Sequence, residues 1–277
     1  MITKPAVDAA LEQIDSEVRT LKISPKSLVK FTDSKDDQRF FSYFNGTNEY
    51  YHRALPLLIN KLGLKNIVEL GSREGVSTLC IWDMLPADAR FTTIDLLKDQ
   101  RYCPDAMYSD PRVNFIFGDV SDLSIFEGKY PFDIDLLFSD TIHYNFQVTD
   151  EFEIYQYFLA DTCLFAIDDI HINDKGKFFD KIPYEKWDLT ELYHKSGWGM
   201  FLYERKEKLT REERLLKAYQ ASAAIWKRKA EEQEAIAQRF TKRSPKHIAK
   251  ATIKRIKPLH SLLTGAYNRY NANRLRK

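Results

Sequence analysis

The chain has 277 residues, of which 44% are apolar and 30% are charged, a composition that allows a buried core and excludes wholesale disorder. No apolar run approaches the roughly 20 residues that a membrane-spanning helix needs, and residues 1–20 lack the apolar segment of a signal peptide. The formal net charge of +2 hides a division, because residues 1–203 carry −12 and residues 204–277 carry +14. The three cysteines are an odd number without paired spacing, so we expect reduced thiols and a cytoplasmic location.

The first predicted elements are helical. Apolar residues recur at steps of three and four over residues 5–22, which predicts an amphipathic helix. An aromatic-rich stretch follows over 31–51, and its rings either belong to the core or line a lid or substrate surface. A second helix is predicted over 51–62, where Gly63 ends it.

Strands and helices alternate from residue 66 onward. Short apolar strands are predicted at 66–70, 91–94, 113–117, 134–138 and 162–167, with helices at 76–85 and 148–159. This alternation implies a doubly wound, mainly parallel α/β sheet, a Rossmann-like fold covered by helices on both faces. Residues 198–203 would add a late, antiparallel strand. Ligands bind beyond the carboxyl ends of the strands in such sheets, so acidic residues that follow the strands should face one crevice.

The last part of the chain is basic and helical. A long charged helix is predicted over 209–240, and a second basic helix over 246–263 after Pro245 interrupts the first. The predicted organisation is therefore an N-terminal helical or lid segment (1–50), a catalytic α/β domain (51–204) and a basic helical extension (205–277).

A glycine turn follows the first predicted strand, in the segment Glu69-Leu-Gly-Ser-Arg-Glu-Gly-Val-Ser77. Glycine lets the backbone approach a ligand closely, and the next helix offers free N–H groups at its start. The three-glycine dinucleotide pattern and the phosphate-binding lysine of nucleotide-hydrolysing enzymes are both absent. The spacing E-x-G-x-x-x-G-x-S instead resembles the first motif of class I S-adenosylmethionine (SAM)-dependent methyltransferases.

The resemblance runs over about residues 50–203 and implies a cofactor site. It places Glu69 near the cationic methionine end of SAM, Asp95 on the ribose hydroxyls and Asp119 near the adenine amino group. A carboxylate suits a diol because it accepts two hydrogen bonds. The alternative for each acid is a surface residue beside a turn. The residues predicted to bind the cofactor are Glu69, Gly71, Ser72, Gly75, Ser77, Asp95, Asp119 and Asp140.

Three further acids, Asp140, Asp168 and Asp169, follow the fourth and fifth predicted strands. Converging carboxylates repel one another unless a cation lies among them, and hard oxygen ligands suit Mg²⁺. His143 lies three residues after Asp140 and could remove a proton from a substrate hydroxyl. The alternatives are that His143 only partners Asp140 and that Asp168 caps a helix.

This constellation resembles the metal-dependent sugar O-methyltransferases of macrolide biosynthesis and the cephalosporin-tailoring and rhamnosyl methyltransferase group. The resemblance implies Asp140, Asp168 and Asp169 as Mg²⁺ ligands and His143 as the base. Several members have Glu where this chain has Asp168. Catechol-type methyltransferases also use acids at strand ends, so a small hydroxyl acceptor other than a sugar is the alternative. Tyr144 and His171 are further candidates for substrate contact.

The basic segment 235–277 predicts an anionic partner. A membrane surface is the favoured partner, which would place the enzyme at the inner face of the membrane. A protein partner or self-association as a homo-oligomer is the second alternative, and nucleic acid is the least favoured. A SAM-binding module that uses this extension without catalysis is the non-enzymatic alternative.

Overall fold

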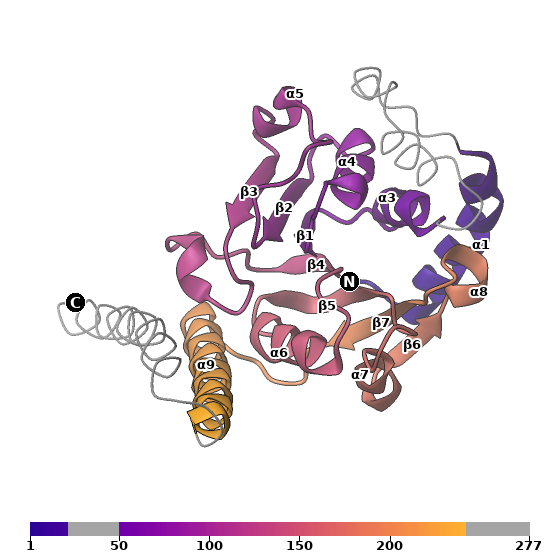
Figure 1. The fold of residues 1–277 in the computed structure, drawn as a ribbon. Coiled ribbons are helices and arrows are strands. Elements are labelled where there is room, and N and C mark those ends of the chain that lie inside the picture. Colours follow the sequence, from indigo (N-terminus) through magenta and orange to yellow (C-terminus); the bar gives the residue numbers. More distant parts are fainter. Residues whose placement is uncertain (22–49, 242–277) are drawn as a thin grey trace.

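The computed structural model describes residues 1–21 and 50–241 (Figure 1). The predicted basic helix at 246–263, most of the predicted membrane-binding segment and most of the aromatic stretch at 31–51 lie outside the described residues. Within the described residues no helix is both long and apolar enough to cross a membrane.

The centre of the fold is a seven-stranded sheet in the order β3-β2-β1-β4-β5-β7-β6. Its strands are β1 (Asn66–Leu70), β2 (Arg90–Asp95), β3 (Val113–Phe117), β4 (Ile134–Ser139), β5 (Leu159–Asp168), β6 (Glu185–Asp188) and β7 (Trp198–Glu204). The first five are parallel, and β7 runs antiparallel between β5 and β6. The order reverses between β1 and β4, where an open α/β sheet forms its ligand crevice. The predicted doubly wound α/β fold is confirmed, including the late antiparallel strand.

One face of the sheet is covered by α1 (Lys4–Thr20), α3 (Tyr51–Leu62), α4 (Val76–Asp83) and the short α8 (Thr190–Tyr193) (Figure 1). Val7, Ile14 and Val18 of α1 are fully buried in the same core as α3, which explains the apolar spacing in the sequence. Trp187 of β6 donates a 2.7 Å hydrogen bond to Asp8 and so ties α1 to the sheet edge.

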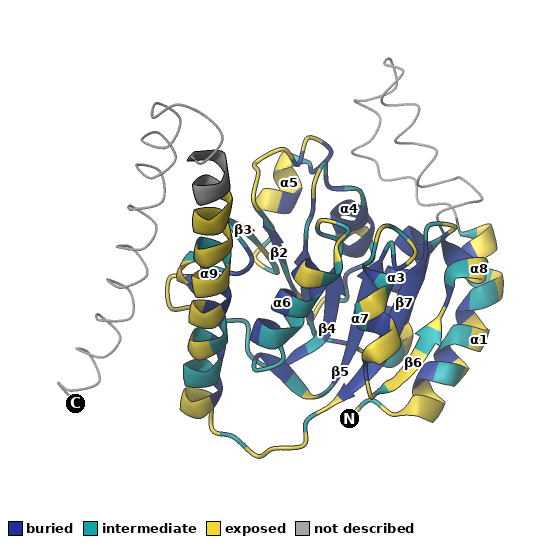
Figure 2. Ribbon diagram, turned by 60° about the horizontal axis from the view of Figure 1, so that its bottom comes forward, coloured by how far each residue is buried: buried dark blue, intermediate teal, exposed yellow. Residues whose placement is uncertain are grey.

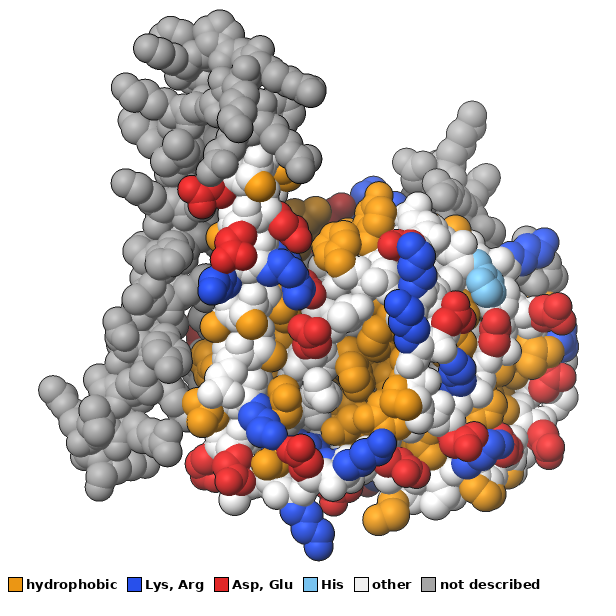
Figure 3. All heavy atoms as spheres, turned by 90° about the horizontal axis from the view of Figure 1, so that it is seen from below, with side chains coloured by type: hydrophobic (Ala, Val, Ile, Leu, Met, Phe, Trp, Pro, Cys, Tyr) orange, Lys and Arg blue, Asp and Glu red, His pale blue; other side chains and the backbone are white. Residues whose placement is uncertain are grey.

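The other face carries α6 (Asn145–Tyr155), α7 (Gly176–Lys181) and α9 (Arg211–Thr241). The buried side of α9 turns toward α6 (Figure 2), with Ala218 and Ile225 in the shared core. Hydrophobic side chains gather beside α9 on the face seen in Figure 3, and charged residues of both signs lie along the helix. The short helices α5 (Asp105–Tyr108) and η2 (Leu123–Phe126) flank β3.

The structure corrects some element boundaries. α6 begins at Asn145 and ends at Tyr155, so the expected helix at 148–159 was misplaced by three to four residues. Its first amide belongs to Asn145 and donates to the Asp174 carboxylate, a distant partner that local sequence does not reveal. Leu159 instead starts β5 by pairing with Ile134 of β4. The edge strand β6 was not predicted.

Candidate active site

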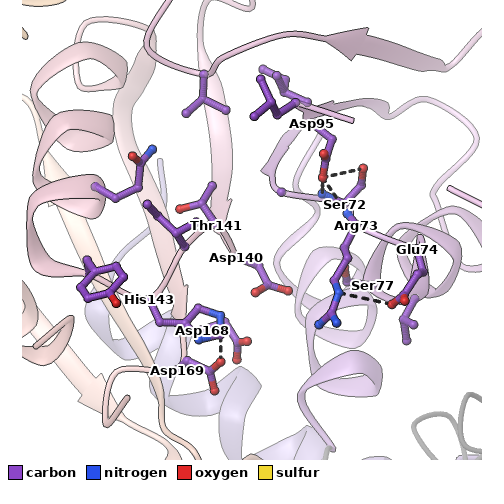
Figure 4. Close-up of a pocket in the computed structure, with 18 of the residues that line it drawn as sticks. Ser72, Arg73, Glu74, Ser77, Asp95, Asp140, Thr141, His143, Asp168 and Asp169 are labelled. Atoms are coloured by element: carbon purple, nitrogen blue, oxygen red, sulfur yellow. Dashed lines mark hydrogen bonds and ion pairs between the residues drawn. The ribbon is translucent and has the colours of Figure 1, made fainter. Parts of the chain in front are cut away.

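A cavity of about 1190 Å³ opens at the carboxyl ends of the parallel strands (Figure 4). Acids from the ends of four strands line it, as the strand pattern predicted. The predicted site residues in its wall are Gly71, Ser72, Ser77, Asp95, Asp119, Asp140, His143, Tyr144, Asp168 and Asp169. Glu69, Gly75 and His171 do not line it.

The glycine turn forms the floor of the cavity between β1 and α4. Gly71 has φ +91°, and a Cβ placed there would lie 2.1 Å from the Asp140 carbonyl oxygen, so only glycine fits. Gly75 has φ +94° and precedes α4 directly. It does not line the cavity and its Cα faces Cys103, whose Sγ would lie 2.5 Å from an added Cβ, so its predicted cofactor contact stays a prediction. Both glycines shape the turn, but Gly71 alone borders the cavity.

Glu69 lies beneath the glycine turn and does not line the wall of the cavity. The side chain is fully buried and accepts hydrogen bonds from the hydroxyls of Ser77, Thr78 (2.6 Å) and Thr93 (2.6 Å). Burial raises the pKa of Glu69 to about 7, although the three hydroxyl donors oppose the shift. We therefore correct its predicted contact with the methionine end of SAM: Glu69 holds the start of α4 against β2.

Asp95 ends β2 and points into the cavity beside the turn (Figure 4). Its Oδ2 accepts from the backbone amides of Ser72 (2.9 Å) and Arg73 (2.7 Å), and its Oδ1 accepts from the Leu97 amide (2.8 Å). Oδ2 thus uses both of its lone pairs on backbone amides, whereas Oδ1 keeps one for a ligand hydroxyl. The side chain is thus fixed by backbone amides, and its contact with ribose stays a prediction.

A second acidic group lies across the cavity, at the ends of β4 and β5. Burial raises the pKa of Asp140 well above its ordinary value, and the nearby charge of Asp168 raises it further. Burial and the charge of Asp169 likewise raise the pKa of Asp168. Burial alone would also raise the pKa of Asp169, but a hydrogen bond from His194 and the charge of His143 lower it below its usual range. The three carboxyl groups therefore cannot all ionise easily without a cation among them.

Two basic residues that sequence reasoning missed complete this group. His194 Nε2 lies 3.1 Å from Asp169 Oδ1 and 3.3 Å from Asp168 Oδ1. Lys175 is fully buried, donates to the Ser139 carbonyl oxygen at 3.4 Å, and lowers the pKa of Asp140 by its charge. Neither residue stands in a recognisable motif; His194 reaches the site only because β7 returns antiparallel beside β5.

The donor set fits a divalent cation. Ligand atoms of Asp168, Asp169 and His194 all lie within 4.8 Å of one another. Asp168 Oδ1 is buried and, apart from its contact with His194 Nε2 at 3.3 Å, accepts no hydrogen bond from the described residues, so it is available to a ligand. Asp140 is not in this compact group but hydrogen-bonds to Asp168. Two of the three predicted ligands, Asp168 and Asp169, belong to this group together with His194, and the metal site stays a prediction.

His143 lines the cavity beside the acid group, and its role as the base stays a prediction. Its Nε2 is 3.2 Å from Asp169 Oδ2, and its side chain is 38% exposed toward the cavity. The contact with the carboxylate orients the imidazole. His143 therefore pairs with Asp169, whereas the alternative from the sequence was a pairing with Asp140.

The two candidate substrate residues differ. Tyr144 lines the cavity, and its ring stacks on Phe146 with centroids 5.7 Å apart. His171 lies outside the cavity and contacts Thr190 Oγ1 at 3.1 Å and Asp188 Oδ2 at 3.6 Å. Asp169 has φ +56°, so the chain turns after it and carries His171 toward β6. The predicted role of His171 is corrected accordingly.

Comparisons with known proteins agree with this architecture. Residues 68–170 match a family model described as a methyltransferase domain. The O-methyltransferase TomG from Streptomyces achromogenes, involved in tomaymycin synthesis and solved with SAM, superposes with a TM-score of 0.52 at 15% identity, over 70% of this chain and 96% of TomG. The Podospora anserina methyltransferase PaMTH1, solved with S-adenosylhomocysteine (SAH), gives 0.50 at 14% identity over 74% and 98%. No curated protein matches the chain in sequence.

The fold is shared with these solved methyltransferases, and residues 68–170 match the methyltransferase domain. None of these comparisons points to a sugar acceptor, which stays a prediction.

Proposed function

We propose that this enzyme transfers the methyl group of SAM to a hydroxyl oxygen of a small acceptor. The observation that carries the proposal is His143 beside Asp169, in the same cavity as the glycine turn. A base at this position takes the hydroxyl proton as the new O–C bond forms and the S–C bond of the sulfonium breaks. The transfer needs little more than alignment, because the sulfonium is already activated.

The acid group supports a metal-assisted form of the reaction. Asp168 and Asp169 would hold a divalent cation together with His194 or Asp140. Such a cation would act as a Lewis acid that lowers the pKa of the acceptor hydroxyl. Carboxylates alone favour Mg²⁺, the predicted ion, whereas an imidazole ligand also suits Mn²⁺ or Zn²⁺. The positive charge of Lys175 offsets part of the negative charge of Asp140 and Asp168.

The rim of the cavity supports an acceptor with an aromatic or apolar body. Ile142, Tyr144 and Phe146 line the cavity and are 53%, 47% and 50% exposed. A ring bearing two adjacent hydroxyls could rest on these side chains while its oxygens face the acids. This favours the catechol-like alternative over the sugar that the sequence resemblance implied.

A methyl-transfer assay with labelled SAM separates these acceptors. The panel contains aromatic vicinal diols, aromatic alcohols with a single hydroxyl, and simple glycosides. We expect transfer to the vicinal diols, loss of transfer with EDTA, and little transfer to the single-hydroxyl compounds. Transfer to glycosides alone would restore the sugar as acceptor, and SAM binding without any product would indicate a non-catalytic module.

We also propose that the basic segment 235–277 binds an anionic membrane surface. The support is the net charge of +14 over residues 204–277, since each basic residue near anionic lipid contributes about 1 kcal/mol. Co-sedimentation with anionic vesicles tests this, with neutral vesicles as the control. Equal sedimentation with both would contradict it. Binding to RNA, or a concentration-dependent dimer in light scattering, would identify the alternative partners.

A further inference from the structure

The C-terminal helix α9 reaches the edge of the cofactor cavity at Lys229. We propose that α9 completes the nucleoside end of the SAM site, with Lys229 as a cofactor-binding residue and Ser222 as a positioning residue. The proposal rests on SAM occupying this cavity and adds a binding element outside residues 68–170, which match the methyltransferase domain.

The direction of the cofactor follows from the site. The methyl group must face His143 and the acids at the ends of β4 and β5, so the sulfonium lies on that side. The ribose diol then meets Asp95 at the end of β2. The base must extend farther in the same direction, toward the loop after β3, because β3 is the outermost strand there. Gly118, Asp119 and Val120 of that loop line the cavity.

Three α9 side chains hold this loop at Ser121, which is 1% exposed. Ser222 Oγ donates to the Ser121 carbonyl oxygen at 2.6 Å, and Trp226 Nε1 donates to the same oxygen at 3.1 Å. Lys229 Nζ donates to Ser121 Oγ at 3.1 Å. All three partners lie on one face of α9, at steps of four and three residues.

The hydrogen bonds between α9 and Ser121 affect the cavity wall through Asp119. The Ser121 amide donates a 2.8 Å hydrogen bond to Asp119 Oδ1 and so orients the acid expected near the adenine amino group. Fixing Ser121 from α9 therefore fixes the direction of Asp119. The loop is also held from α6, where the Tyr155 hydroxyl donates to the Val120 carbonyl oxygen at 3.1 Å.

Lys229 can also contact the ligand directly. Its ammonium has three donors, and Ser121 Oγ accepts from one of them. The nearest carboxylate oxygen of Asp150 is 4.0 Å away, and Arg228 already pairs with that carboxylate. The side chain is 26% exposed at the cavity edge, so a donor is available to a ring nitrogen of adenine or to a ribose oxygen.

The test is calorimetric titration of the full chain with SAH and with 5′-methylthioadenosine, which keeps the nucleoside but lacks the amino acid. We expect Lys229→Gln to weaken both ligands by the same factor, about tenfold, as for a lost hydrogen bond from a charged donor. Lys229→Arg should recover most of the affinity. Ser222→Ala should weaken both ligands about threefold, and Ser222→Thr should restore them.

Lys217→Gln is the matched control, because Lys217 lies on the same helix but pairs with Glu207 in solvent at 2.7 Å. Its affinities should equal those of the wild type. Thermal melts of each variant separate lost binding from lost folding. Wild-type affinity in folded Lys229→Gln and Ser222→Ala would overturn the inference. Failure of the wild type itself to bind SAH would instead overturn the cofactor site on which it rests.

Discussion

The two halves of the cavity are built in different ways. The half at the ends of β1 and β2 is held by a local turn and by backbone amides. For example, Asp95 accepts hydrogen bonds from the amides of Ser72 and Arg73. The half at β4 and β5 is held by side chains that meet from distant parts of the chain, as where His194 reaches Asp168 and Asp169. A local motif is enough to bind a cofactor of fixed shape. The acid group at β4 and β5 instead needs charged side chains that only the complete fold brings together.

His143→Gln should produce the largest effect. It should lower turnover, which depends on the half at β4 and β5, and leave cofactor binding intact. Removal of the base is expected to lower turnover by about 10²- to 10⁴-fold, while SAH affinity stays within about twofold. Steady-state kinetics and SAH titration measure the two quantities. His171→Gln is the control, since His171 lies outside the cavity and should leave turnover unaltered. Unchanged turnover in His143→Gln would remove His143 as the base.

Gly71→Ala should break both halves together, because Gly71 packs against the Asp140 backbone. Strain at positive φ and the clash with the Asp140 carbonyl oxygen should lower the free energy of unfolding by about 3 kcal/mol and abolish SAH binding. Gly128→Ala has φ +85° but open space around its Cα, so it should cost only about 1 kcal/mol. Denaturant unfolding of both variants measures the difference. Equal losses would show that the contact between the halves is unimportant.

Asp95→Ala should affect the cofactor half alone. Loss of the carboxylate removes the anchor of the Ser72 and Arg73 amides and the expected acceptor for the ribose diol. SAH affinity should fall about tenfold, as for the loss of charge-assisted hydrogen bonds. The affinity for a divalent cation, measured by titration with Mg²⁺ or Mn²⁺, should be unaltered. Wild-type SAH affinity in this variant would refute the role of Asp95.

The effect of Glu69 falls on stability alone and depends on pH. Its pKa is raised to about 7 in the folded protein, so the folded state binds the proton more tightly than the unfolded state. Its contribution to stability is therefore complete below about pH 4.5 and is lost as the pH rises through about 7, by at most about 3 kcal/mol. Glu69→Gln should remove this dependence. Denaturant unfolding of both proteins at pH 5 and pH 8 measures it, and parallel pH profiles would contradict the buried, protonated Glu69.

The sequence predicts much of the cofactor half because its signals are local. A short apolar strand, a glycine turn and an acid at the next strand end each appear within a few residues of chain, and Gly71, Ser72 and Asp95 lie as expected. Glu69 was misassigned since sequence alone does not show which way a strand-end side chain points. The strand alternates its faces, and Glu69 turns toward Ser77 and Thr93 inside the fold.

The chemical half was only partly predictable. Asp140, Asp168 and Asp169 stand at the ends of β4 and β5, with His143 three residues after Asp140, so their convergence could be inferred from the parallel sheet. His194 and Lys175 could not, because the antiparallel return of β7 and the burial of a loop lysine depend on tertiary packing. The same limit applies to α9, whose reach to the cavity through Lys229 follows from its packing on α6.

Calorimetric titration with SAH, followed by a divalent cation, tests the central claim most directly, on wild type and on Asp168→Asn. The account predicts SAH binding in the micromolar range by both proteins and a separate cation site that Asp168→Asn loses. Retention of the cation site in Asp168→Asn would contradict the assignment of the acid group. Absence of SAH binding by the wild type would contradict the claim that this cavity is a methyltransferase site.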